Sequence, residues 1–301
     1  MPIIAPKKLT FVVNPYGGKK KGPAIMRQIK PVFEAQGIEL DIIESQHKRH
    51  AWSIIQALDP TGVDGICGVG GDGTLHELVN GLLSRADGAR IPIGMVPAGS
   101  GNAFMESLKC LDPIDAAQRI AYGHTRPIDV ASVSLGGEQT IYACNIVGWG
   151  LPTDIQHTAE KFRWMGGAQY TFAAAIEVLK GKKRRGRLLV DGEEINARFS
   201  FILACNTPFT GRSMLMAPRA KMSDGYIDLL IVRKAHRFQL LKLLPKTFSG
   251  KHVTSPLVEY RYVKEFAFFP EVDEPVNIDG ELEGKTPIRL KMMPHAFQLL
   301  I

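Results

Sequence analysis

The chain has 301 residues, of which 45% are hydrophobic and 22% are charged, values ordinary for a globular protein with one or two domains that each bury a core. Its formal net charge of +7 and its sequence pI of about 9.2 favour an anionic partner, such as nucleotide phosphates or an anionic membrane surface. The sequence lacks zinc-finger spacing, an RNP-type aromatic pattern and a DNA-reading helix, so we expect no nucleic-acid partner.

No apolar run approaches the length of a transmembrane segment; the best candidate, residues 170–179, is short and contains Glu177. The four cysteines are widely spaced among apolar neighbours, which favours reduced, buried thiols. The N-terminus shows neither a signal peptide nor a myristoylation glycine. We therefore expect a cytoplasmic protein that associates with membranes peripherally, and we leave a homodimer open.

The first half of the chain alternates strand-like and helix-like segments. An apolar run at residues 9–13 ends at Asn14 and leads into a glycine- and lysine-rich loop that fits phosphate contact or, alternatively, a solvated basic loop. The segments that follow read as a helix, a strand and a helix at residues 23–35, 39–44 and 51–58. This alternation predicts an α/β domain with a doubly wound parallel sheet.

A glycine-rich loop follows the next apolar run, at residues 65–69. Three glycines, Gly70, Gly71 and Gly73, allow the backbone to approach a ligand closely, and the helix start behind them attracts anions. Thr74 and Glu77 have the spacing of a capping box. Asp72 would repel a bare phosphate, so we expect a divalent cation that bridges the two. The alternative is a turn between strand and helix in which Glu77 only caps.

A second glycine loop comprises Gly99, Ser100, Gly101 and Asn102. It lies between a strand-like run at residues 91–96 and a helical run at 103–108. In a parallel sheet both loops would lie at the same edge, which is where such sheets bind ligands.

After residue 126 the pattern changes to short alternating runs with turns such as Gly136-Gly137 and Asp279-Gly280. We therefore predict a nucleotide-binding α/β domain at residues 1–126 and a β-rich domain of sandwich type at residues 127–301, with the extreme C-terminus packing back on the first domain.

One helical segment interrupts the second half. Phe162, Met165 and Phe172 follow helical spacing, which fits either a packed core or the cover of an acyl-chain pocket. The basic cluster at residues 182–187 fits either a solvated turn or attraction to anionic lipid.

The GGDGT and PAGSGN motifs, in this order, resemble the lipid kinases of the diacylglycerol kinase/sphingosine kinase catalytic family, and more distantly NAD kinases and phosphofructokinases. The resemblance runs from Val12 almost to the C-terminus. It implies an NAD kinase-like first domain, a C-terminal β-sandwich, ATP and Mg²⁺ as cofactors, and a lipid substrate at a membrane surface. It also implies that Asn14 and the two glycine loops bind the nucleotide, and we place Glu77 at the same site.

The resemblance further suggests roles in the second half. Asp279 would be the catalytic base, with Asp72 as second candidate, and Glu281 would orient adenosine or metal waters. Arg163 would approach a nucleotide phosphate, and Asp224 would hold a structural metal ion or be a plain turn residue. An acidic lipid-contact position of the sphingosine kinases falls at Gln156, so Asp154 is carried over in its place.

The substrate follows less directly. Asn102-Ala103 resembles the sphingosine and ceramide kinases, and the run from Glu160 to Arg163 resembles the sphingosine kinases; this resemblance implies a sphingoid base, with diacylglycerol as the alternative. A soluble-metabolite kinase of the NAD type and an inactive nucleotide- or lipid-binding protein are further alternatives.

Overall fold

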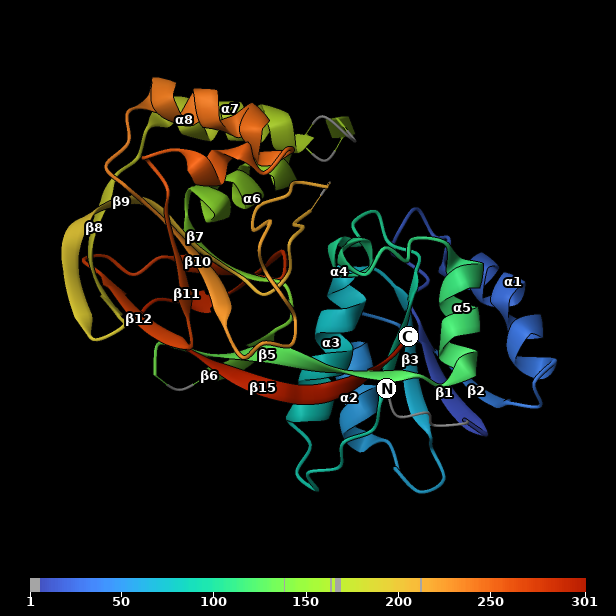
Figure 1. Ribbon diagram of the computed structural model, residues 1–301. Coiled ribbons are helices and arrows are strands. Elements are labelled where there is room, and N and C mark those ends of the chain that lie inside the picture. Colours follow the sequence, from blue (N-terminus) through green and yellow to red (C-terminus); the bar gives the residue numbers. More distant parts are fainter. Residues whose placement is uncertain (1–5, 138, 163, 166–168, 212) are drawn as a thin grey trace. The chain divides into compact units, whose positions relative to one another are not determined.

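The computed structural model describes residues 6–137, 139–162, 164–165, 169–211 and 213–301 (Figure 1). The chain divides into two compact units, one comprising Met1–Val130 with Pro294–Ile301 and the other comprising Ala131–Met293. The division lies a few residues beyond the boundary that the sequence suggests. The last residues of the chain belong to the first unit.

The first unit contains a parallel sheet. Its strands are β1 (Lys8–Val13), β2 (Glu39–Glu44), β3 (Gly65–Gly70) and β4 (Ile93–Pro97), in the spatial order β4-β3-β1-β2. The end of strand β15 (Ile288–Leu300) pairs with β4 in parallel, at Leu299 and Leu300. β1, β3 and β4 are almost entirely buried because helices cover both faces.

Five helices belong to this unit: α1 (Gly22–Glu34), α2 (His50–Ala57), α3 (Asp72–Leu83), α4 (Ala103–Ser107) and α5 (Pro113–Tyr122). Helices α1 and α5 cover one face of the sheet, and α2 and α3 cover the other (Figure 1). Helix α1 buries Met26, Ile29 and Phe33 at helical spacing, and the ring of Phe33 packs edge-on against Phe11 of β1 at 5.1 Å. The predicted doubly wound α/β fold is confirmed.

The second unit is mainly antiparallel. Its strands are β5 (Thr125–Leu135), which begins in the first unit, β6 (Gln139–Ala143), β7 (Ile146–Gly150), β8 (Arg184–Val190), β9 (Glu193–Cys205), β10 (Ile227–Arg233), β11 (Glu259–Val263), β12 (Glu265–Pro270), β13 (Pro275–Ile278), β14 (Glu281–Lys285) and the first part of β15. The strand order β14-β13-β7-β9-β8-β12-β15 continues into β5 and β6, and β10 and β11 pair beside β9. An aromatic group in the core contains Trp149, Phe199 and Phe268, with ring centroids 4.4 and 5.5 Å from Phe268.

Short helices gather on one side of these strands (Figure 1). They are α6 (Leu151–Lys161), α7 (Gln169–Lys180), α8 (Arg237–Leu243) and the single turns η2 (Leu244–Thr247) and η3 (Lys251–Thr254). Helix α8 buries Leu240 and Leu243 in a second core with Leu203 and Leu230 of the sheet. No helix in the described part of the chain is long and apolar enough to span a membrane.

Candidate active site

Two glycine loops touch each other in the first unit. The amide of Ala98 donates to the carbonyl of Gly70 at 2.8 Å, and the amide of Asp72 donates to the carbonyl of Gly101 at 3.3 Å. A Cβ atom added to Gly99 would lie 2.5 Å from the Cα of Gly71, closer than real Cβ contacts allow. The absence of side chains at this contact therefore lets the two loops form one surface.

Asp72 fastens the first loop to the helix that follows the second loop. One of its carboxylate oxygens accepts the amide hydrogen of Ala103 at 2.9 Å, and the other accepts that of Phe104 at 3.0 Å. Asn102 closes the second loop on itself, because its side chain both accepts from the amide of Gly99 and donates to the carbonyl of Gly99. The loop backbone is thus fixed by its own bonds.

Asn14 brings a third loop to the same place. Its side-chain oxygen accepts from the amides of Tyr16 and Gly17, which turns the chain at the end of β1. Its side-chain nitrogen donates to Thr74 Oγ1 at 3.5 Å. Gly73 and Ser100 are the exposed members of the two glycine loops. The structure therefore brings together Asn14, Gly70–Thr74 and Gly99–Asn102.

The predicted capping box is wrong. Helix α3 begins at Asp72, with extended Gly71 as its N-cap, so Thr74 already lies inside the first turn and is buried. The carboxylate of Glu77 instead accepts from the amides of Arg49 and Ala51, at 2.8 and 3.0 Å, and so caps the start of α2. We therefore leave Glu77 out of the proposed nucleotide site.

A second carboxylate that binds backbone amides lies in the second unit. Asp279 is 7% exposed and accepts three amide hydrogens, from Asn145 and Ile146 on one oxygen and from Cys144 on the other, at 2.8–2.9 Å. These amides lie where β6 ends and β7 begins, so the carboxylate holds the break between the two strands. Asp279 has a left-handed φ of +52°, and Gly280 follows with +93°.

Sequence reasoning did not predict the side-chain hydrogen bonds that link this turn to the helices. Gln156 of α6 donates from Nε2 to the carbonyl of Gly280 at 2.8 Å, and the hydroxyl of Tyr170 on α7 donates to Gln156 Oε1 at 3.1 Å. We saw no local signal for either bond. Glu281 follows the turn as the first residue of β14.

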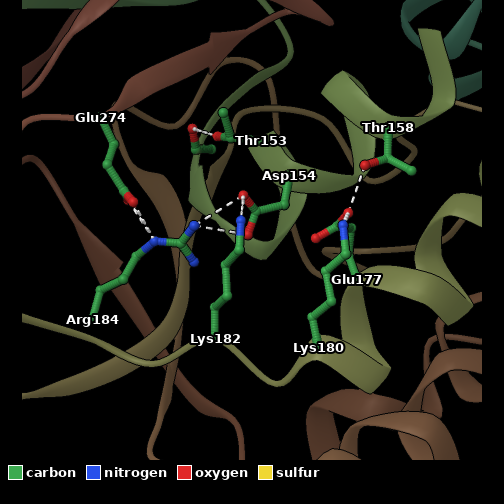
Figure 2. Close-up of polar contacts among 9 residues, drawn as sticks. Thr153, Asp154, Thr158, Glu177, Lys180, Lys182, Arg184 and Glu274 are labelled. Carbon is green, nitrogen blue, oxygen red and sulfur yellow. Dashed lines mark hydrogen bonds and ion pairs between the residues drawn. The ribbon is translucent and has the colours of Figure 1, made fainter. Parts of the chain in front are cut away.

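Asp154 is paired with cations of its own chain (Figure 2). Arg184 Nη2 lies 2.9 and 2.8 Å from its two oxygens, and Lys182 Nζ lies 3.2 Å from one of them. Arg184 Nε also donates to Glu274 at 2.6 Å. Burial opposes the charge of Arg184, but the hydrogen bonds to Glu274 and Asp154 prevail and raise its pKa. Two residues of the basic cluster at residues 182–187, Lys182 and Arg184, therefore form ion pairs within the unit.

The same view shows a buried link between α6 and α7 (Figure 2). Glu177 is 3% exposed and accepts from the hydroxyl of Thr158 and from Nζ of Lys180, each at 2.5 Å. Hydrogen bonds from Lys180 and Thr158 outweigh the effect of burial and lower the pKa of Glu177. The helix pair is thus held together by a charged group as well as by apolar contacts.

The predicted lipid-contact residues lie on or beside the helix pair. Phe162 is the C-cap of α6, and its ring packs edge-on against Phe172 of α7 at 5.1 Å. The amide of Met165 donates to the carbonyl of Phe162 at 2.9 Å. Phe172 is 44% exposed, so it is not a core residue. Arg163 lies outside the described residues.

Asp224 is an exposed turn residue whose carboxylate accepts from the amide of Tyr226 at 3.1 Å. Within the described ranges, no group of three or more His, Cys, Asp and Glu side chains is arranged to hold a metal ion. The predicted metal role of Asp224 therefore stays a prediction.

Two family descriptions match consecutive parts of the chain. Residues 8–133 match the diacylglycerol kinase catalytic domain, and residues 145–301 match the YegS C-terminal NAD kinase beta sandwich-like domain. Both match the expected organisation, an NAD kinase-like first half followed by a β-sandwich.

Named relatives and solved structures agree with this. Sphingosine kinase 2 of Arabidopsis thaliana is 35% identical, and the alignment covers 92% of this chain and 69% of the relative. A diacylglycerol kinase of Mycobacterium tuberculosis is 27% identical, over 97% of this chain and 94% of the relative. A crystal structure of a diacylglycerol kinase from Bacillus anthracis superposes with a TM-score of 0.74 at 19% identity, over 98% of this chain and 96% of that one, and so supports the fold. The chain therefore belongs to the diacylglycerol kinase catalytic-domain family of lipid kinases, which includes the sphingosine kinases, and is a kinase with an alcohol group as phosphoryl acceptor.

Proposed function

We propose that this kinase uses ATP to phosphorylate the hydroxyl of a long-chain lipid, with a sphingoid base as the favoured acceptor and diacylglycerol as the alternative. The joined glycine loops are the observation that supports ATP binding, because they would present closely packed backbone amides and a helix start to phosphate. The identity of 35% to a named sphingosine kinase, against 27% to a named diacylglycerol kinase, supports the order of the two acceptors.

One observation favours the alternative acceptor. An ammonium group on a sphingoid base would need a carboxylate, and Asp154 is already paired with Arg184 and Lys182. Diacylglycerol carries no such group and does not need Asp154. The acceptor test below therefore includes both classes of lipid.

The nucleotide would lie on the glycine loops of the first unit, with Asn14 beside the phosphates. The carboxylate of Asp72 fits a Mg²⁺ ion, because magnesium in kinases is bound by one or two carboxylates together with phosphate oxygens and waters. Bound there, the ion would neutralise charge on the transferred phosphoryl group. Arg163 and Glu281 remain proposed contacts of the nucleotide or of the metal waters.

Phosphoryl transfer asks mainly for positioning and for charge stabilisation, and the acceptor proton leaves late. We rank Asp72 first and Asp279 second as the group that orients the hydroxyl and takes its proton. The reason is access, since Asp72 is partly exposed and accepts two amide hydrogens, whereas Asp279 is 7% exposed and accepts three. This order reverses the one that the family resemblance implies.

The helices of the second unit offer a surface for a membrane. Phe172 and Leu179 of α7 are 44% and 49% exposed, and exposed Lys183 follows them in the chain, together with Lys180 and Lys182, which also pair with Glu177 and Asp154. Basic residues near an anionic bilayer contribute about 1 kcal/mol each. We propose peripheral docking through this face, and Phe172→Ser should reduce cosedimentation with phosphatidylserine vesicles.

The test is phosphate transfer from radiolabelled ATP to sphingosine, ceramide, diacylglycerol, monoacylglycerol and NAD, each offered separately, the lipids in detergent. Labelling of a lipid that is lost in Asp72→Asn supports the proposal. Labelling of NAD alone would show a soluble-metabolite kinase, and nucleotide binding without any labelled product would show an inactive binding protein.

A further inference from the structure

A chain of side-chain hydrogen bonds joins the helix pair to the acidic turn, which we define as residues 279–281. The hydroxyl of Tyr170 donates to Oε1 of Gln156, and Nε2 of Gln156 donates to the carbonyl of Gly280. The three groups come from α7, α6 and the turn between β13 and β14, and residues 156 and 280 are 124 positions apart. This contact therefore depends on the tertiary fold.

The acidic turn is held at every peptide group around Gly280. Its amide donates to Asn277 Oδ1 at 2.9 Å, and the amide of Asp279 donates to the carbonyl of Ile146 at 3.0 Å. Both Asp279 and Gly280 are left-handed, a conformation that residues with a Cβ atom adopt at an energetic cost. Such a turn keeps its geometry only where neighbouring groups fix it, and Gln156 is the side chain that does so from the helices.

We propose that Gln156 is a positioning residue, which fixes the peptide between Gly280 and Glu281 and ties it to the helix pair. The inference rests on the proposed function, in which Glu281 contacts the nucleotide or its metal waters. An amide suits this role because it donates to the Gly280 carbonyl and accepts from Tyr170 at the same time. A leucine can do neither, and an ionised glutamate cannot donate.

The test compares kcat and KM of wild type, Gln156→Leu, Gln156→Glu and Tyr170→Phe on the lipid that wild type phosphorylates. Leaving the Gly280 carbonyl without its donor should lower kcat by about tenfold in Gln156→Leu, with a smaller change in the KM of the lipid. Tyr170→Phe should show a smaller loss because it only releases the acceptor end of the amide.

Gln156→Glu provides the readout that a purely structural role would not give. A protonated glutamic acid can donate to the carbonyl and an ionised one cannot. The activity of this variant relative to wild type should therefore rise as the pH is lowered from about 8 to about 5. Gln156→Leu should show no such rise. Urea midpoints of Gln156→Glu measured at both pH values separate positioning from a change in stability, because protonation of a partly buried glutamate can also stabilise the fold.

Gln239→Leu is the matched control. Gln239 of α8 likewise bonds a backbone group, accepting from the amide of His236 at 2.8 Å, but it does not contact the acidic turn. Its kcat should equal that of wild type. If wild type is active and Gln156→Leu is folded and fully active, the inference is overturned and the proposed function stands. The same holds if Gln156→Glu shows no gain in activity at low pH. A wild type that labels no lipid would overturn the proposed function, and this inference with it.

Discussion

Replacing Asp279 by Asn should destabilise the second unit more than it impairs the chemistry. The carboxylate accepts three backbone hydrogen bonds and is 7% exposed, so solvent cannot replace them. In the variant the side-chain oxygen can still accept from Asn145 and Ile146, but the new amide nitrogen faces the N–H of Cys144. Asn tolerates the left-handed backbone as well as Asp does, so we expect no additional strain.

The magnitude follows from the bonds. Loss of one charge-assisted hydrogen bond costs about 2 kcal/mol, and conversion of the other two into neutral bonds costs about 1 kcal/mol each. The free energy of unfolding should therefore fall by about 4 kcal/mol, which lowers the urea midpoint by about 2 M. Fluorescence reports this because Trp149 lies in the core of the same unit.

Asp224→Asn is the control, since that carboxylate is exposed and accepts a single amide hydrogen, from Tyr226. Its free energy of unfolding should change by less than about 1 kcal/mol. Kinase activity is then measured in the cold, where Asp279→Asn is still folded. There it should keep kcat within about tenfold of wild type, while Asp72→Asn loses about 100-fold or more.

Two results would refute this reasoning. An unchanged urea midpoint in Asp279→Asn would mean that the three amides do not depend on the carboxylate. A folded but inactive Asp279→Asn would return the role of base to Asp279 and place Asp72 second.

Three further changes follow from the same structure. Gly99→Ala places a Cβ atom 2.5 Å from the Cα of Gly71 and should weaken ATP binding by about tenfold in calorimetry, whereas Gly211→Ala, with open space around the added atom, should not. Burial raises the pKa of Asp228 to about 6, above its unfolded value of about 3.9, so ionisation destabilises the fold as the pH rises through that interval. Asp228→Asn should therefore become more stable relative to wild type by about 2 kcal/mol between about pH 4 and about pH 7, and parallel urea midpoints across that range would contradict this. Arg184→Lys, whose single ammonium group cannot replace both the Nη2 bonds to Asp154 and the Nε bond to Glu274, should lower the thermal midpoint by about 5 °C, and an unchanged midpoint would show that these bonds contribute nothing.

The glycine loops could be predicted from sequence because their chemistry is local. Three glycines around Asp72 can be read without knowing the fold, and so can a second glycine loop after the next strand-like run. The sequence places the N-cap of α3 at Thr74 because a Thr-x-x-Glu pattern is typical of a capping box. The pattern alone does not show that the N-cap is instead Gly71. The first amides of α2 are the better partners of Glu77, and they come from a segment 26 or more positions away.

Contacts between distant segments could not be predicted either, because they depend on the tertiary fold. Nothing local distinguishes Arg184 from its basic neighbours, yet it alone among the residues drawn in Figure 2 bonds both Asp154 and Glu274. The break between β6 and β7 is held by a carboxylate 133 or more positions further along the chain. Such features depend on which strands become neighbours, and alternation of apolar residues does not specify that.

Each unit uses an aspartate beside a glycine to fix the backbone of another segment. Asp72 binds the amides that start α4, and Asp279 binds those between β6 and β7. For a phosphoryl-transfer enzyme this rigidity is itself catalytic, because transition-state stabilisation comes from groups whose positions are set before the reaction. A substitution at either aspartate therefore changes geometry and charge together. Stability and kcat of the same variant have to be measured side by side before either carboxylate is assigned a proton.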